Sequence, residues 1–209
     1  MSSAFSGRRD GIDSLDAQFW DERFAANFTP WDQGGVPIEL KNFIAQAAAP
    51  CTTLIPGCGF AHELAHFRNV GWAATAIDFS AIAVRQAQQK APQWQADILE
   101  ADFFKFTPTQ APTLIYERAF FCALPPAKRA DIVQRWAQLL APQGLLAGYF
   151  FIEDDEGAES AKKGPPFSIT RQHLLDGMAE HFTLLEEQIA RQSIAVFQGK
   201  ERWMVWQRR

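Results

Sequence analysis

The chain has few cysteines, no long apolar segment and no large excess of charge of either sign. Its three cysteines are an odd number without paired spacing, which argues against a disulfide framework and leads us to expect a reducing, cytoplasmic compartment. The longest apolar stretch, Gly144 to Ile152, is far shorter than the roughly 20 residues of a membrane-spanning helix. The opening residues lack the apolar run of a signal peptide. A net charge of −4 argues against nucleic acid as the main partner.

The chain does have enough apolar material for one complete domain. Of its 209 residues, 47% are hydrophobic, and a chain of this size buries about 70% of the surface that it exposes when unfolded. Its 18 phenylalanines and 7 tryptophans are mostly explained by an aromatic-rich core. We expect residues 1–13 to form a flexible N-terminus and residues 14–209 to form a single domain.

The spacing of apolar residues predicts a helical N-terminal arm followed by alternating strands and helices. In the arm, residues 16–28 and 37–48 have helical spacing and are separated by a loop that contains Pro30 and two glycines. Beyond the arm, we expect strands at 51–55, 72–77, 95–100, 113–117, 144–151, 182–189 and 202–207, and helices at 61–69, 81–91, 126–140 and 171–180. This alternation indicates an α/β fold with a doubly wound, mostly parallel sheet whose C-terminal strand is antiparallel.

The turn after the first predicted strand carries two glycines, Gly57 and Gly59. In a doubly wound sheet, ligands bind beyond the carboxyl ends of the strands, and glycines there let the backbone approach a ligand closely. Asp78 ends the second predicted strand, about 20 residues further on, where a carboxylate accepts both hydroxyls of a ribose. The two features together favour a nucleotide site over an ordinary tight turn, which is the alternative.

Two classes of nucleotide fit this pattern. A nicotinamide dinucleotide places its pyrophosphate against the helix N-terminus, usually with a third glycine, but His62 occupies that position. S-adenosylmethionine has no pyrophosphate and needs only the close backbone approach and the ribose acceptor. After the third predicted strand, Asp102 offers a carboxylate to an adenine amino group, and the following Phe103 offers a ring to the base. The alternative for Asp102 is an ordinary strand-end turn.

Residues 62–66 match the H-E-x-x-H pattern, in which two histidines one turn apart hold zinc. The helix that carries them starts directly from the glycine turn, so its first turn points at the nucleotide site, and no further histidine follows nearby. We therefore expect no metal site. Cys58 and Cys122 lack a histidine in a base position and are interpreted as packing residues.

Several segments from about residue 16 to the C-terminus together resemble one enzyme family. They are 19–24, 29–34, 54–59, 76–80, 102–104, 115–120, 122–126 and 164–167. Trp-Asp, Pro-Gly-Cys-Gly and Gly-Pro-Pro-Phe in this order are similar to the thiopurine, thiol and halide methyltransferase family, which uses S-adenosylmethionine on a Rossmann-like fold. Two departures are Phe24, where many members have tryptophan, and Glu117, where relatives commonly have aspartate.

The resemblance implies a contact for each part of S-adenosylmethionine. It assigns the cofactor to Trp20, Phe24 and Trp31 on the arm, Gly57 and Gly59 at the turn, Asp78 at the ribose, Asp102 and Phe103 at the adenine, and Arg118 near the methionine end. Residues 14–49 would then form a helical arm, or lid, over the cofactor. The implied product is S-adenosylhomocysteine. We expect a monomer whose partner is a small-molecule acceptor, with no nucleic acid or membrane partner.

The chemistry that the resemblance implies is an in-line displacement at a sulfonium, in which positioning and desolvation supply much of the catalysis. A free thiol has a pKa near 8.5, so a nearby cation would help to ionise the acceptor. We expect Arg118 to supply this charge and Glu117 to act on the proton, with a structural ion pair between the two as the alternative. Tyr116 and Tyr149 are further candidates for the proton. The residues expected to line the acceptor pocket are Trp31, Tyr149 and Phe167.

The class of acceptor stays open at this point. The leading hypothesis is a small sulfur nucleophile, either a thiol or a thiopurine, because the family that the chain resembles carries that activity. The alternatives are methyl transfer to halide or thiocyanate, a non-catalytic domain that binds S-adenosylmethionine as a sensor, and a nicotinamide oxidoreductase.

Overall fold

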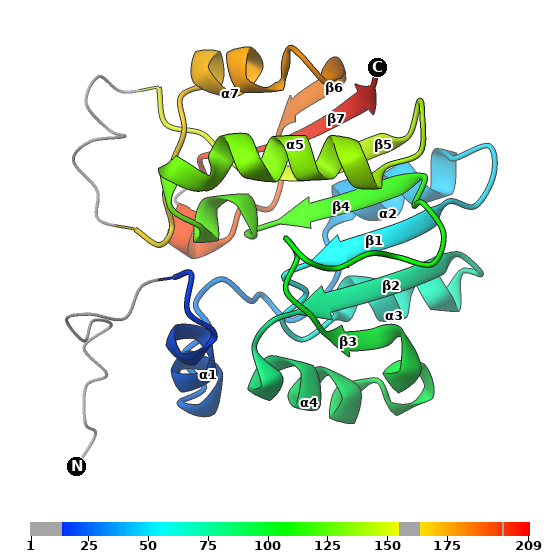
Figure 1. Ribbon diagram of the computed structural model, residues 1–209, viewed down its shortest axis with the longest axis vertical. Helices are drawn as coiled ribbons and strands as arrows, with labels where there is room; N and C mark the ends of the chain where they lie inside the picture. Colours follow the sequence, from blue (N-terminus) through cyan, green and yellow to red (C-terminus); the bar gives the residue numbers. More distant parts are fainter. Residues whose placement is uncertain (1–13, 155–163, 198) are drawn as a thin grey trace.

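The computed structural model describes residues 14–154, 164–197 and 199–209, and its strands form one seven-stranded sheet (Figure 1). The strand order is β3-β2-β1-β4-β5-β7-β6. The strands are β1 (Thr52–Pro56), β2 (Ala73–Asp78), β3 (Ile98–Glu100), β4 (Leu114–Arg118), β5 (Leu145–Phe151), β6 (Phe182–Ile189) and β7 (Glu201–Arg208). All neighbouring strands are parallel except that β7 runs antiparallel to both β5 and β6. The predicted sheet, mostly parallel with an antiparallel C-terminal strand, is therefore confirmed.

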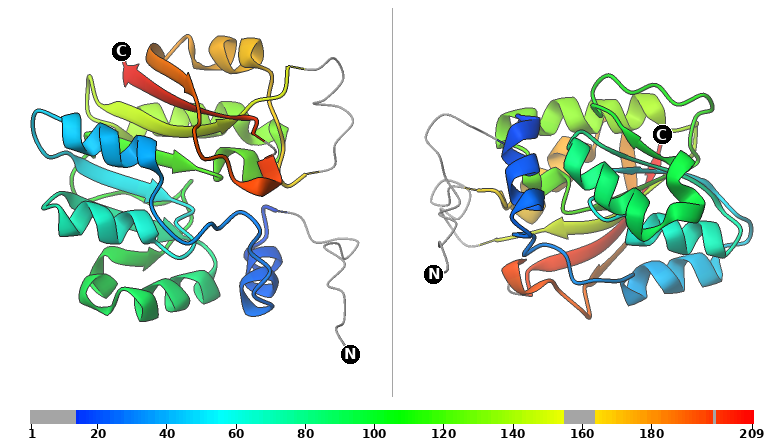
Figure 2. Two further views of the ribbon diagram at one scale, coloured as in Figure 1. Left: turned by 180° about the vertical axis from the view of Figure 1, so that it is seen from behind. Right: turned by 90° about the horizontal axis from the view of Figure 1, so that it is seen from below.

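Helices cover both faces of the sheet (Figures 1 and 2). One face carries α2 (Ile38–Gln46), α3 (His62–Asn69) and α4 (Ala81–Lys90), and the other carries α5 (Arg129–Leu139) and α7 (Arg171–Met178). Successive residues of a strand point to opposite faces, so Leu54 packs in the core beneath α5 while Ile55 packs in the core beneath α3. The central strands β1, β4 and β5 are mostly apolar because both of their faces are buried.

The largest disagreement with the predicted elements lies around the third strand. The sequence predicts a strand from residue 95, but residues 92–97 form a 3₁₀ segment, η1 (Pro92–Asp97), and only 98–100 are extended. The Trp94 N–H donates to the Ala91 carbonyl, and proline at the start of this segment favours a tight turn over a strand. In the same way, the helix predicted from residue 126 begins as a separate 3₁₀ turn, η3 (Pro126–Lys128), before α5.

The N-terminal arm is tied to the first turn of α4. Its helix, α1 (Ala17–Ala25), presents Asp21, whose Oδ1 accepts the Ser80 hydroxyl at 2.6 Å and the Ile82 N–H at 3.1 Å. Ser80 in turn caps α4 by accepting the Ala83 N–H. This contact holds α1 beside the edge where the first strands end (Figure 1). The flexible segment predicted at 1–13 lies outside the described residues, and the single domain with a lid at 14–49 stays a prediction.

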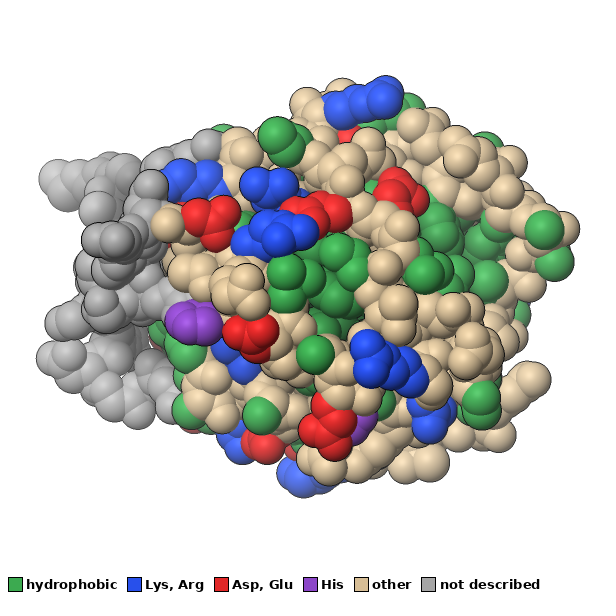
Figure 3. Space-filling model, turned by 90° about the horizontal axis from the view of Figure 1, so that it is seen from above, with side chains coloured by type: hydrophobic (Ala, Val, Ile, Leu, Met, Phe, Trp, Pro, Cys, Tyr) green, Lys and Arg blue, Asp and Glu red, His purple; other side chains and the backbone are tan. Residues whose placement is uncertain are grey.

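The edge strand β6, at the other end of the strand order from β3, carries charged side chains. Glu187 on β6 pairs with Arg171 at 2.8 Å and with Arg202 at 3.1 Å. Seen from this side, the surface shows acidic and basic groups among apolar ones (Figure 3). Charged residues on an edge strand discourage its pairing with another chain. In the described part of the chain, no helix has both the length and the apolar character that crossing a bilayer requires.

Candidate functional site

A cavity of about 850 Å³ lies at the carboxyl edge of the sheet. The turn after β1 and the ends of β2 and β4 border it on one side. On the other sides it is bordered by the arm and by residues of η2 (Phe121–Ala123), of 164–167 and of η4 (Ala195–Phe197). Because β1 has β2 on one side and β4 on the other, the cavity lies at the switch point of the sheet, where ligands of such folds bind.

The backbone of the glycine turn is left-handed at three places. Gly57 has φ +60°, Gly59 has φ +52°, and Ala61, directly before α3, has φ +55°. Glycine adopts this region without steric cost. A Cβ built on Gly57 would also lie 2.7 Å from Cδ2 of Phe120, so both the conformation and the neighbouring ring require glycine at this position.

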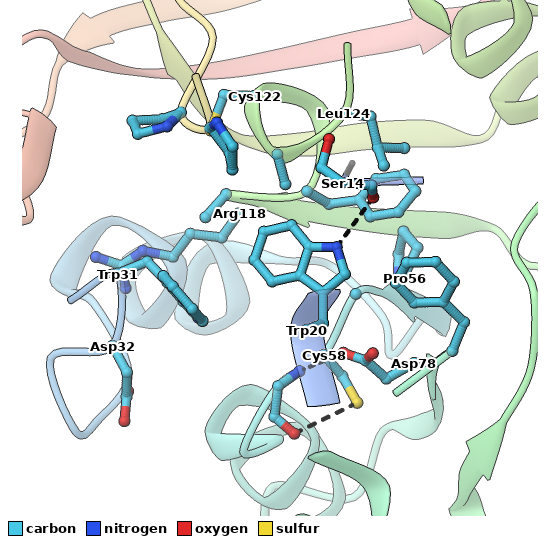
Figure 4. Close-up of a pocket in the computed structure, with 18 of the residues that line it drawn as sticks. Ser14, Trp20, Trp31, Asp32, Pro56, Cys58, Asp78, Arg118, Cys122 and Leu124 are labelled. Atoms are coloured by element: carbon cyan, nitrogen blue, oxygen red, sulfur yellow. Dashed lines mark hydrogen bonds between the residues drawn. The ribbon is translucent and has the colours of Figure 1, made fainter. Parts of the chain in front are cut away.

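Asp78 connects the end of β2 to the glycine turn. Its Oδ2 accepts the Gly59 N–H at 3.0 Å and its Oδ1 accepts the Ser80 N–H at 2.9 Å. Burial raises the pKa of Asp78 to about 6, and these N–H groups offset only part of that effect. A carboxylate has about four acceptor positions, so the two hydrogen bonds leave capacity for a ligand. The carboxylate borders the cavity (Figure 4).

Asp102 and Phe103 border the cavity next to Asp78. Asp102 Oδ1 accepts the Phe104 N–H at 2.9 Å, and its Oδ2 lies 3.0 Å from the Lys105 ammonium. Asp102 therefore forms the strand-end turn that the sequence offered as the alternative, while it also faces the cavity. Phe103 is buried and packs against Phe120, with the ring centroids 5.0 Å apart.

Three aromatic side chains of the arm line the cavity as one cluster. Trp31 makes edge-to-face contacts with Trp20 at 5.3 Å and with Phe24 at 5.9 Å between ring centroids. The Trp20 indole N–H donates to the Ser14 carbonyl at 3.0 Å, as the dashed line in Figure 4 shows. Trp20 and Phe24 come from α1, and Trp31 comes from the loop that follows this helix. The resemblance assigned these three residues to the cofactor, whereas the spacing of the apolar residues predicted only the helix.

Arg118, at the end of β4, is the cation among the predicted site residues that borders the cavity. Its Nη1 lies 3.9 Å from Oε1 of Glu63, and its guanidinium carbon lies 4.8 Å from the centroid of the Tyr149 ring. Burial disfavours the charge, but the surrounding tyrosines and carboxylates, Glu63 among them, outweigh it and raise the pKa of Arg118. Glu63 also accepts the Tyr116 hydroxyl at 3.5 Å. Glu63 was not predicted as a site residue.

Glu117 and Tyr149 do not line this cavity. Both oxygens of Glu117 accept the Phe121 N–H, at 3.1 and 3.3 Å, and burial raises the pKa of this carboxyl group to about 8. The Tyr149 hydroxyl donates to Glu39 at 2.7 Å, on the side of α2. Neighbouring strand residues face opposite sides of the sheet, so Arg118 and Glu117 diverge, and the charged partner of Arg118 is Glu63 instead.

His62 joins α3 to the arm, which the sequence analysis missed. Its Nε2 lies 3.2 Å from Oδ1 of Asp32, and both side chains border the cavity. The hydrogen bond to Asp32 raises the pKa of His62. Burial of Asp32 works in the opposite direction, but the same bond and the Gly34 N–H lower the pKa of Asp32. Within residues 14–154, 164–197 and 199–209, no group of three His, Cys, Asp or Glu side chains is placed to hold a metal ion.

The remaining wall is formed by segments far along the chain. Phe167 borders the cavity, and its N–H donates to the Cys122 carbonyl at 2.7 Å. The Gln33 amide donates to the Ser193 carbonyl at 3.0 Å and so connects the arm to the loop before β7. Burial raises the pKa of the Cys58 and Cys122 thiols well above the usual value, so both stay protonated and suit packing rather than nucleophilic roles.

Known proteins share both the sequence and the fold. The chain matches the family described as Thiopurine S-methyltransferase (TPMT) over residues 15–209. It is 32% identical over 197 residues to the thiopurine S-methyltransferase of Vibrio vulnificus (strain YJ016), which covers 84% of this chain and 87% of that protein. It is 26% identical over 198 residues to thiocyanate methyltransferase 1 of Brassica oleracea, covering 90% and 84%. The solved structure of the N-methyltransferase NodS from Bradyrhizobium japonicum WM9, in complex with S-adenosylhomocysteine, has the same fold, with a TM-score of 0.68 and 17% identity over 92% of this chain and 97% of that one.

Proposed function

Because the chain belongs to the thiopurine S-methyltransferase family, we propose that its cavity holds the nucleoside end of S-adenosylmethionine against Asp78 and a small acceptor beneath the arm. The protein is an S-adenosylmethionine-dependent methyltransferase that acts on a small sulfur nucleophile. The observation that carries the placement is the buried Asp78 carboxylate, which is fixed by two N–H groups and still has acceptor capacity toward the cavity.

The residues of the cavity fit this donor part by part. Gly57 and Gly59 keep the backbone beside Asp78 clear of Cβ atoms, which allows close approach. Phe103 offers a buried ring for the adenine, and Asp102 offers its remaining acceptor capacity to the adenine amino group. The faces of Trp20, Phe24 and Trp31 suit a sulfonium, since aromatic rings attract cations.

The catalytic work of the chain is positioning and exclusion of water. When bound, S-adenosylmethionine would supply an electrophilic methyl group: a sulfur nucleophile attacks its carbon in line, and S-adenosylhomocysteine leaves as the bond from the sulfonium to the methyl group breaks. The apolar walls around Trp31 and Phe167 desolvate the nucleophile and hold it in place. Aromatic rings favour the charged ground state as well, so they strengthen binding more than they raise the rate.

Arg118 is the protein cation that we assign to the ionisation of the acceptor. An alkyl thiol is only a few per cent thiolate at neutral pH, and a guanidinium close to the thiol favours the thiolate. Glu117 does not line the cavity, and its carboxylate accepts the Phe121 N–H on the other side of the strand. We therefore assign no proton transfer to Glu117 or to Tyr149.

Two further features of the protein belong to this proposal. All three cysteines are free thiols, and two of them are buried, which supports a cytoplasmic location. The charged β6 edge supports a monomer.

Methyl transfer to a panel of acceptors tests the proposal. We would incubate the protein with S-adenosylmethionine and an alkyl thiol, a thiopurine, sulfide, iodide or thiocyanate, and measure S-adenosylhomocysteine and the methylated product. We expect turnover of a thiol or a thiopurine. Turnover of only iodide or thiocyanate would favour the halide alternative, and binding without any turnover would favour a sensor.

Substitution of Asp78 tests the position of the donor. Asp78→Ala should weaken binding of S-adenosylhomocysteine about 10- to 100-fold, because the ribose loses its acceptor and two N–H groups lose theirs. Asp176→Asn, on the exposed side of α7, is the matched control and should leave the dissociation constant unchanged. Equal affinities for Asp78→Ala and the parent protein would contradict the assignment.

A further inference from the structure

Asp21 is a charged residue of the arm whose side chain lies outside the cavity wall. Trp20 and Phe24, on the same helix, line the cavity, whereas Asp21 does not. Asp21 contacts the start of α4 instead, where its Oδ1 accepts the Ser80 hydroxyl at 2.6 Å and the Ile82 N–H at 3.1 Å. One carboxylate oxygen therefore receives two hydrogen bonds at a helix N-terminus, where negative charge is favoured.

Ser80 connects this contact to Asp78, the proposed ribose acceptor. The Ser80 hydroxyl donates to Asp21 and accepts the Ala83 N–H at 3.1 Å, while the Ser80 backbone N–H donates to Asp78 Oδ1 at 2.9 Å. Ser80 is completely buried, and its hydroxyl has a single proton to donate. A shift of Asp21 therefore disturbs Ser80, and with it one of the hydrogen bonds that hold the Asp78 carboxylate.

An apolar cluster and a longer hydrogen bond also join α1 to α4. Aromatic rings of the arm pack with Ala83 in a small buried cluster, separate from the two large cores of the sheet. The Gln86 amide donates to the Phe24 carbonyl at 3.3 Å. Hydrogen bonds to a carboxylate are about twice as strong as those between neutral groups, so the contacts of Asp21 contribute strongly to holding the arm on α4.

Asp21 is also a second negative charge close to Asp78. Burial has the largest effect on Asp78 and raises its pKa, hydrogen bonds from neighbouring N–H groups lower it, and the charge of Asp21 raises it further. Two other ionisable groups near Asp78 are the Cys58 thiol, which burial keeps protonated, and Asp102, which pairs with Lys105. Removing the charge of Asp21 should therefore let Asp78 ionise at a lower pH.

We infer that Asp21 is a positioning residue of the donor site, which through Ser80 holds both the aromatic wall of the arm and the ribose acceptor Asp78 in place. The inference rests on the proposed function. Because Asp21 does not line the cavity, it acts on a ligand only through the residues that do. Two walls that lie far apart in the sequence, the arm and the end of β2, then depend on one side chain.

The hydrogen bonds and the charge of Asp21 should have separable effects on binding. Its oxygen holds the arm and Ser80, which should strengthen binding at every pH. Its charge opposes the ionisation of Asp78, which should weaken binding only at low pH. A residue with a merely structural role would show the first effect without the second.

Asp21→Asn isolates the charge, because the amide oxygen can still accept from Ser80 and Ile82. The probe is 5′-methylthioadenosine, which has the nucleoside and sulfur of the donor but no amino-acid end. By calorimetry, the parent protein should bind it about 10-fold more weakly at pH 5 than at pH 8, and Asp21→Asn should reduce this ratio to about 5-fold or less. Glu22→Gln removes the same charge from the next position on α1 and should keep the ratio of the parent.

Asp21→Ala tests the hydrogen bonds. It removes the acceptor of both donors on α4 and should weaken S-adenosylhomocysteine about 5- to 10-fold at pH 8, whereas Asp21→Asn should stay within about 2-fold of the parent protein. Ser80→Ala removes the other partner of the same bond. The loss of affinity in the double variant should therefore be smaller than the product of the two single losses.

The outcomes separate this inference from the proposed function. A pH 5 to pH 8 ratio in Asp21→Asn equal to that of the parent protein would show a merely structural role and overturn the inference. Equal affinities of Asp21→Ala and the parent protein, or a double variant whose loss equals the product, would overturn it as well. If the parent protein binds neither ligand at pH 8, the proposed function itself fails. Should Asp21→Ala fail to fold, the ratio in Asp21→Asn still decides.

Discussion

The part of the cavity that we assign to the nucleoside of the donor (the nucleoside half) and the part that we assign to the acceptor (the acceptor half) are formed by different kinds of structural element. In the nucleoside half, Asp78 and Asp102 sit at strand ends and are held by neighbouring backbone N–H groups. In the acceptor half, the walls are side chains of the arm and of distant loops, connected by single contacts such as Gln33 to Ser193. The donor site is therefore a property of the sheet, while the acceptor site depends on segments that the sheet does not fix in place.

The strongest test of this contrast is a substitution in the backbone of the nucleoside half. Gly57→Ala should lower the free energy of unfolding by about 2–4 kcal/mol, because it combines a left-handed φ with a Cβ in contact with Phe120. Gly71→Ala also has a positive φ, but nothing lies within 4 Å of its Cβ. Urea denaturation should show a clearly smaller loss for Gly71→Ala, and equal losses would remove the Phe120 contact from the explanation.

Binding of a ligand in the nucleoside half should also depend on pH. The pKa of Asp78 is raised from 3.8 to about 6, and ribose hydroxyls donate best to the ionised carboxylate. Affinity for 5′-methylthioadenosine should therefore rise up to about 10-fold per pH unit below pH 6 and level off above it. The stability of the protein without ligand should depend on pH in the opposite direction. The contribution of Asp78 to the free energy of unfolding falls as pH rises from about 4 to about 6, because burial disfavours the ionised carboxylate.

Asp78→Asn isolates this titration from that of other groups. Calorimetry between pH 5 and pH 7 should give a weaker but nearly flat affinity for this variant. If affinity changed with pH to the same extent in the parent protein and in Asp78→Asn, the pH dependence would belong to another residue.

In the acceptor half, single side chains should matter for the acceptor and not for the donor. Phe167→Ala removes a half-buried ring from the cavity wall and should raise the KM for a thiol about 5- to 10-fold. The dissociation constant of S-adenosylhomocysteine should stay within about 2-fold. Leu185→Ala, on the exposed side of β6, is the control. If Phe167→Ala weakened only the binding of S-adenosylhomocysteine, Phe167 would belong to the nucleoside half of the cavity and not to the acceptor half.

The smallest expected effect is on stability and concerns the contact of His62 on α3 with Asp32 on the arm. The His62–Asp32 pair is partly exposed and should contribute at most about 1 kcal/mol to stability. The pKa of Asp32 is lowered and that of His62 is raised, so the contribution is present above about pH 4 and is lost as pH rises through the pKa of His62. Glu63 and Lys90 also face His62, with opposite effects on its charge.

A double-mutant cycle isolates this pair. Asp32→Asn and His62→Gln should show a coupling energy at pH 6 that disappears at pH 9. The same coupling at both values of pH would contradict an ion pair between these residues.

The difference between the halves also explains how much could be predicted from sequence. The alternation of strands and helices, the glycine turn and Asp78 are local patterns, and the structure brings them to one cavity. The contact between Glu63 and Arg118 was not predicted, because the two residues are more than 50 positions apart in the chain. Contacts of that kind depend on which strands become neighbours, and that order has no local signature.

One part of the site was open to prediction but was not predicted. A strand alternates its side chains between two faces, so assigning Arg118 to the cavity already implies that Glu117 points away. The structure agrees, since Glu117 holds the Phe121 N–H in the opposite core. The position of Tyr149 could not be predicted in this way. Its hydroxyl donates to the buried carboxylate of Glu39, which lies on α2 and is far from Tyr149 in the chain.

The most direct test of the account is a crystal structure of the protein with S-adenosylhomocysteine. We expect the ribose hydroxyls on the carboxylate of Asp78, the adenine beside Phe103, and the methionine end near Arg118. A nucleoside bound away from the glycine turn, or a saturated crystal with this cavity empty, would contradict it.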